Sequence, residues 1–137
     1  MTDQKPTSAS AFRAIRAIDY TVIFARDMAA MRGFYEGVLG FALLRELSPD
    51  WLEYRIGDNT LALAKPKRTA VDVSLPIGSA SLQLAFKVTA AEVDQCADEL
   101  VAKGVGLVSP PTDQAFGHRT LFFRDPDGNL VEVYADI

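Results

Sequence analysis

FYEGVLGF at residues 34–41 and DPDGNLVE at residues 125–132 are the two stretches that decide the fold of this chain of 137 residues. The first continues an apolar spacing of i, i+3, i+4, i+7 and i+8 that begins at Met31, which predicts one buried helical face. Asp27 offers a side-chain oxygen as the N-cap, and Gly40 ends the helix because glycine adopts the left-handed conformation at little cost. In the second stretch, DPDGN has the residues of a tight turn between two strands.

These stretches belong to two halves that have the same order of expected elements. The first half is expected to contain a strand, a helix and three strands, at residues 18–25, 28–39, 41–47, 51–56 and 60–64. The second half repeats this order at residues 81–88, 90–103, 105–109, 119–124 and 130–135, with a loop at 110–117. Thr89 and Glu92 form a capping box at the start of the second helix. Each half is therefore a βαβββ module, and the two modules should pack together to cover their sheets.

The expected modules divide the chain into four parts. Residues 1–14 are mostly polar or small, and we expect them to form a flexible tail. Residues 15–137 form a single domain, because the chain is too short for two ordinary domains. Within it, residues 17–66 are module one and residues 81–137 are module two. Residues 67–80, which contain proline and basic residues, are the linker.

Composition excludes several classes of function. The net charge is −4, and basic residues are dispersed, so we expect no nucleic-acid partner. No apolar run approaches the roughly 18 residues that cross a bilayer, so we expect no membrane association. The single cysteine, Cys96, cannot form an internal disulfide. The N-terminal residues also lack the apolar stretch that a secretory signal peptide contains. Both observations favour a cytoplasmic protein.

Three segments together resemble one known family. They are residues 18–41, the stretch from Gly117 to Phe123, and residues 125–132. Their order is similar to that in the glyoxalase / bleomycin-resistance / extradiol-dioxygenase superfamily, also called the vicinal oxygen chelate superfamily. The resemblance covers residues 17–136. It implies an α+β fold in which two tandem βαβββ modules form curled mixed sheets around a cleft, and it implies a homodimer. The fold hosts many chemistries, so it does not identify a reaction.

The resemblance also bears on metal binding. Metal enzymes of the superfamily place one ligand on the first strand and one on the last strand of each module, positions that match Tyr20, Ala62, Gln83 and Glu132. Alanine cannot bind a metal, and a protonated phenol is a poor ligand for divalent ions. We therefore expect no cofactor. If a divalent metal binds weakly, Gln83 and Glu132 are its expected ligands.

Strand alternation predicts which side chains line the cleft. Gln83 and Glu132 should point away from the flanking apolar residues that pack beneath the helices. The candidate ligand-binding residues on the cleft faces are Tyr20, Val22, Phe24, Gln83, Phe122, Glu132 and Tyr134. This set is largely apolar with a few polar groups, which is typical of a site for a small, partly apolar molecule.

Three functions remain open. The first is a metal-free protein that binds a small molecule, because the expected metal ligands are incomplete. The second is a lyase, isomerase or dioxygenase of the same superfamily that uses Glu132 as a general base or as a ligand of a degenerate metal site. His118, the only histidine, is a further candidate acid or base; pairing Arg124 with Leu130 would place it opposite Asp136, about four residues from Glu132. The third is a structural or partner-binding module.

Overall fold

The computed structural model describes residues 10–66 and 82–137. The linker expected at 67–80 and the first nine residues of the expected tail lie outside these ranges. Residues Ala11–Ala14 form a 3-10 turn, η1, within the segment that we expected to be part of the tail. Among the described residues, no helix is long and apolar enough to span a membrane.

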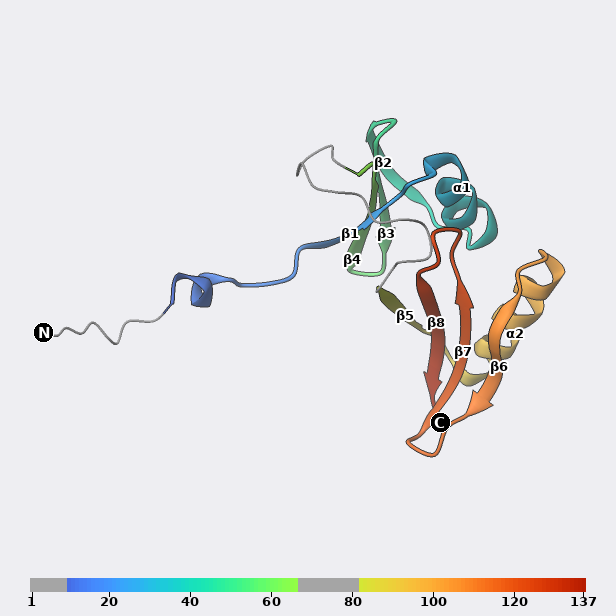
Figure 1. Cartoon of the computed structure of the whole chain (residues 1–137). Coiled ribbons are helices and arrows are strands. Elements are labelled where there is room, and N and C mark those ends of the chain that lie inside the picture. Colours follow the sequence, from blue (N-terminus) through green and yellow to red (C-terminus); the bar gives the residue numbers. More distant parts are fainter. Residues whose placement is uncertain (1–9, 67–81) are drawn as a thin grey trace, which may run out of the picture.

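Each module contains one four-stranded mixed sheet (Figure 1). The elements of module one are β1 (Tyr20–Phe24), α1 (Met28–Arg32), the π-helical turn η2 (Gly33–Val38), β2 (Leu43–Ser48), β3 (Trp51–Ile56) and β4 (Asn59–Ala64). Module two contains β5 (Gln83–Lys87), α2 (Ala90–Ala102), β6 (Leu107–Asp113), β7 (His118–Arg124) and β8 (Leu130–Asp136). The strand orders β1-β4-β3-β2 and β5-β8-β7-β6 are equivalent. In each sheet the neighbouring strands that come first and last in the module's sequence, β1 with β4 and β5 with β8, are parallel. The predicted repeat of two βαβββ modules is confirmed.

The ends of the two main helical segments are as the sequence predicts. Gly40 and Gly104 follow them with φ of 73° and 79°, in the left-handed region that glycine adopts without strain. The Asp27 side chain caps the first helix by accepting a hydrogen bond from Ala30 N at 3.0 Å. The first helix differs from an ordinary α-helix in its second half, where Leu39 N bonds to Phe34 O in the i to i+5 pattern of a π-helix.

Strand β6 is longer at its C-terminal end than the sequence led us to expect. We expected the strand to end before Pro110, but β6 continues through Pro110 and Pro111 to Asp113. A register shift between Ser109 and Thr112 leaves both prolines without a partner on β7. Because β6 is the last strand of its sheet, their missing N–H groups break no ladder hydrogen bond. His118, expected in the loop before the strand, is the first residue of β7.

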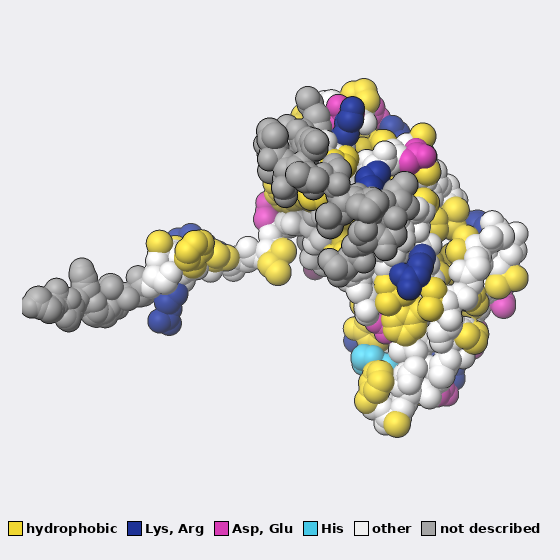
Figure 2. All heavy atoms as spheres, viewed as in Figure 1, with side chains coloured by type: hydrophobic (Ala, Val, Ile, Leu, Met, Phe, Trp, Pro, Cys, Tyr) yellow, Lys and Arg dark blue, Asp and Glu magenta, His cyan; other side chains and the backbone are white. Residues whose placement is uncertain are grey.

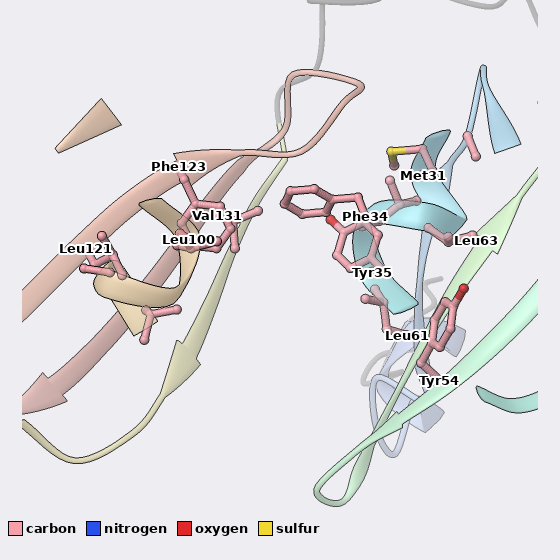
Figure 3. Close-up of a cluster of buried hydrophobic side chains, with 14 of the residues drawn as sticks. Met31, Phe34, Tyr35, Tyr54, Leu61, Leu63, Leu100, Leu121, Phe123 and Val131 are labelled. Carbon is pink, nitrogen blue, oxygen red and sulfur yellow. The ribbon is translucent and has the colours of Figure 1, made fainter. Parts of the chain in front are cut away.

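The modules pack against each other through η2, through Arg26 before α1, and through the turn between β7 and β8. Phe34 lies between the two sheets, with its ring 6.1 Å from that of Phe123 (Figure 3). Next to it, the Tyr35 hydroxyl donates to Asp125 Oδ2 at 2.8 Å. In the same turn, Asp127 Oδ2 accepts hydrogen bonds from Arg26 N at 3.3 Å and Arg26 Nη1 at 3.2 Å. The three polar residues of the DPDGN turn, Asp125, Asp127 and Asn129, are therefore buried, and the two aspartates join the modules.

Candidate functional site

The face of each sheet that points away from its helix, here called the helix-free face, carries the predicted site residues. In module two, Val131 and Val133 are buried in the core, so the intervening Glu132 points to the opposite face. The register places Glu132 between Ala85 of β5 and Phe122 of β7. Gln83 Nε2 donates to Glu132 Oε1 at 3.1 Å. The structure therefore brings together Gln83 and Glu132, which the sequence identified separately.

A second polar group lies further along the same face. The predicted pairing of His118 with Asp136 is confirmed, and His118 Nε2 lies 3.3 Å from Asp136 Oδ1. The His118 ring stacks on Tyr134, with ring centroids 4.6 Å apart. Lys87 Nζ also pairs with Asp136 at 2.8 Å, and its hydrogen bond and charge lower the pKa of that carboxyl. Tyr134 thus stands between this acid–base group and Glu132.

The helix-free face of module one has a different polar group. The register places Ala62 opposite Glu53 of β3, as Glu132 is opposite Phe122 in module two. Glu53 Oε2 accepts from Trp51 Nε1 at 2.6 Å, and its two oxygens accept from Arg45 at 3.1 and 3.2 Å. These bonds, the Trp51 bond first, lower the pKa of Glu53, whose side chain is only 14% exposed.

Sequence reasoning missed Glu53 because the family resemblance implies ligand positions only on the first and last strands of each module, and Glu53 lies on β3. The repeat itself carried a signal, since Glu53 occupies the position in module one that Phe122 occupies in module two. Tyr20 packs its ring edgewise against Trp51, with centroids 5.9 Å apart. The carboxylate of module one therefore lies beside an aromatic pair and is neutralised by Arg45.

The available donors do not fit a superfamily metal centre. Ala62 supplies none, and the Tyr20 ring packs against Trp51. Gln83 and Glu132 remain, and two oxygen donors leave most of the coordination shell of a divalent ion to water. In residues 10–66 and 82–137, no group of three or more His, Cys, Asp or Glu side chains is arranged to hold a metal ion.

A pocket of about 350 Å³ opens where the two modules meet. We call it the junction pocket. Its apolar wall consists of Ile56 and Leu61 from module one and Leu84, Ala85 and Phe86 from β5. Its polar lining residues are Thr21, Asn59, Thr60 and Lys87. Ala85 and Lys87 belong to the helix-free face that also carries Gln83, so the pocket adjoins the Gln83–Glu132 pair along β5. The volume lies within the range of small-molecule sites.

The comparisons with known proteins agree with this architecture. Virulence protein STM3117 of Salmonella typhimurium is 26% identical over 122 residues, which cover 87% of this chain and 83% of that protein. A crystal structure of lactoylglutathione lyase from Agrobacterium tumefaciens is 26% identical, with a TM-score of 0.74 over 87% of this chain and 92% of that one. A glyoxalase/bleomycin resistance protein/dioxygenase from Nocardioides has the same fold, at 22% identity and a TM-score of 0.79, over 96% and 87% of the two chains. Residues 17–133 match the family model, and the chain therefore belongs to the Glyoxalase/Bleomycin resistance protein/Dioxygenase superfamily.

Proposed function

We propose that this protein binds a small, partly apolar molecule beside Glu132, with the apolar part of the molecule in the junction pocket. The observation that carries the proposal is the position of that pocket, which adjoins the Gln83–Glu132 pair along β5. Apolar walls with a few convergent polar groups are typical of small-molecule sites. Binding of this kind needs no metal ion. The homodimer that the family resemblance implies is part of the same proposal.

The side chains indicate what each part of the molecule would contact. Glu132 accepts hydrogen bonds, so it favours a ligand group that donates them, such as a hydroxyl or an amine. The Gln83 amide already donates to Glu132 and leaves its carbonyl oxygen as an acceptor. Phe122 and Tyr134 flank Glu132 on the same face and offer aromatic surface. Tyr20, Val22 and Phe24 are the corresponding residues on module one.

A fragment screen by NMR, followed by calorimetry on the strongest binder, tests the proposal. We expect bound fragments to shift the resonances of β5 and β8. The isosteric variant Glu132→Gln should weaken a fragment with a donor group about tenfold or more, because a hydrogen bond to a charged group is lost. The matched control is Glu46→Gln, since Glu46 pairs with Arg32 on the other face of its sheet. Equal affinity for both variants would overturn the role of Glu132.

An enzymatic function is the second candidate. Gln83 orients the Glu132 carboxylate, and His118 with Asp136 supplies a second acid–base pair on the same face. The candidate activities are those of a lyase, an isomerase or a dioxygenase. Because a relative with 26% identity is named lactoylglutathione lyase, the lyase activity is tested first, with S-lactoylglutathione as the probe. Turnover that Glu132→Gln abolishes while probe affinity is retained would establish Glu132 as the base. Unchanged turnover in that variant would exclude it.

A further inference from the structure

A second pocket lies on the helix side of the molecule and adjoins the junction pocket, with which it shares Ile56 and Phe86. It has a volume of about 200 Å³ and lies between α2 and the segment that follows η2. We call it the helix-side pocket. Its apolar lining residues include Phe41, Phe86, Val88, Cys96 and Leu100, and Glu99 is the charged residue in it. A dry apolar cavity of about 150 Å³ is known to accept a benzene ring, so this pocket is large enough for a phenyl group.

The N-terminal arm, residues 10–19, presents apolar side chains that its own domain does not cover. Phe12, Ile15 and Ile18 are 78%, 69% and 88% exposed. The arm begins with η1, and Ile15 continues with φ −62° and ψ 127°, which is close to polyproline geometry. Figure 2 shows hydrophobic and basic side chains of the arm standing clear of the domain.

Charge and shape match the arm to the helix-side pocket. The arm carries Arg13 and Arg16, and its only acidic residue is Asp19, next to β1. Helix α2, which forms one wall of the pocket, has four acidic residues and no basic residue in AAEVDQCADELVA. Two of the four are paired within the chain, Asp94 with Arg119 and Glu99 with Lys103. A segment with a phenyl ring followed by two guanidinium groups therefore complements an apolar pocket beside a helix that keeps a net negative charge after these two pairs are counted.

The direction of the arm favours a pocket on another copy of the chain. The arm leaves the domain on the side away from α1 and α2, whereas the helix-side pocket adjoins α2 (Figure 1). We propose that the arm of one copy docks on a second copy, with Phe12 in the helix-side pocket and Arg13 and Arg16 against α2. Residues 15–19, when extended, span about 16 Å. The part of η1 up to Phe12 adds about 2 Å per residue, so the Phe12 ring reaches a neighbouring copy at a distance of about 20 Å. Reciprocal exchange of arms produces a closed two-fold dimer.

Cys96 provides a direct readout, because it is the only cysteine and it lines the helix-side pocket. The rate at which a thiol reagent such as DTNB labels Cys96 is measured on the full chain at one pH, from about 1 µM to about 100 µM protein, with sedimentation in parallel. We expect labelling to slow by about tenfold over this range as the dimer forms. The variant Phe12→Ser should label rapidly at every concentration and sediment as a smaller species.

The matched control is Phe116→Ser, because Phe116 is 72% exposed but lies outside the arm. It should behave like the wild type, and circular dichroism should show that both variants are folded. Three results would overturn the proposal. If the rate of Cys96 labelling changes neither with protein concentration nor in Phe12→Ser, the arm does not cover the pocket. If Cys96 is labelled slowly at every protein concentration and this protection is lost in Phe12→Ser, the arm docks on its own chain. Protection by added toluene alone means that the pocket is a small-molecule site.

Discussion

Replacing Tyr35 by phenylalanine tests the contact that joins the two modules. The Tyr35 hydroxyl donates to Asp125 Oδ2 at 2.8 Å; Tyr35 is fully buried and Asp125 is 4% exposed. Asp125 keeps three other hydrogen bonds, from Asp127 N and from the backbone and side-chain nitrogens of Asn129. The phenylalanine ring fills the same space, so no large cavity forms. The expected loss is that of one hydrogen bond to a buried charged group.

Such a bond contributes about 1.5–3 kcal/mol, and we expect about 2 kcal/mol for Tyr35→Phe because Asp125 retains its other donors. In a domain of this size, that loss lowers the melting temperature by roughly 7 °C. Urea unfolding measures the free energy, and a double-mutant cycle with Asp125→Asn isolates the pair. The control is Tyr54→Phe, whose hydroxyl donates to Glu36 within module one at 2.7 Å.

The destabilisation caused by Tyr35→Phe should also depend on pH. Burial, followed by the charge of Asp125, raises the pKa of the Tyr35 phenol. A folded pKa above the unfolded one means that the stabilisation is fully present below an unfolded tyrosine's ordinary pKa of about 10 and is lost as the pH rises beyond it. The difference in stability between wild type and Tyr35→Phe should therefore narrow above about pH 10. A loss below about 0.5 kcal/mol at neutral pH, or a constant difference in alkali, would refute this reasoning.

Two other predictions concern the carboxylates of the helix-free faces. The depressed pKa of Glu53 means that its contribution to stability is present above an unfolded glutamate's ordinary pKa of about 4.3 and is lost as the pH falls through the folded value. Glu53→Gln should therefore be less stable than wild type at neutral pH, and this difference should shrink in acid. Urea titrations at several pH values measure it, and a difference in unfolding free energy that stays the same in acid would count against this role of Glu53. Elemental analysis of protein purified without chelator should find no stoichiometric divalent metal, because Gln83 and Glu132 provide only two donors. Near one zinc, iron, manganese or nickel per chain would contradict that expectation, and retention of the metal in Glu132→Gln would show that the matched ligand positions are wrong.

Much of the fold is visible in the sequence because it depends on local patterns. The apolar spacing around Phe34 and the glycines at 40 and 104 act within one or two turns of helix, so their effect can be predicted residue by residue. Alternation on the strands likewise predicts that Gln83 and Glu132 share a face, and the DPDGN composition predicts the hairpin that sets the pairing of β7 with β8.

Local patterns were insufficient where a partner lies far away in the chain. Glu53 belongs to the helix-free face of module one because β3 pairs with β4 in a register that places it opposite Ala62. Pro110 and Pro111 lie within a strand because β6 is at the edge of its sheet, where a proline breaks no ladder bond. Neither position can be inferred from the neighbouring residues alone.

The sequence by itself therefore determined the repeated module, its helix and turn boundaries, and the pair of polar residues on the second module. Only the tertiary structure decided that Asp125 and Asp127 join the modules and that a pocket opens beside β5. The physical reason is that periodicity and turn chemistry act over a few residues. Docking of the modules depends on side chains about 90 to 100 positions apart, as in Tyr35 with Asp125 and Arg26 with Asp127, which meet only in the folded chain.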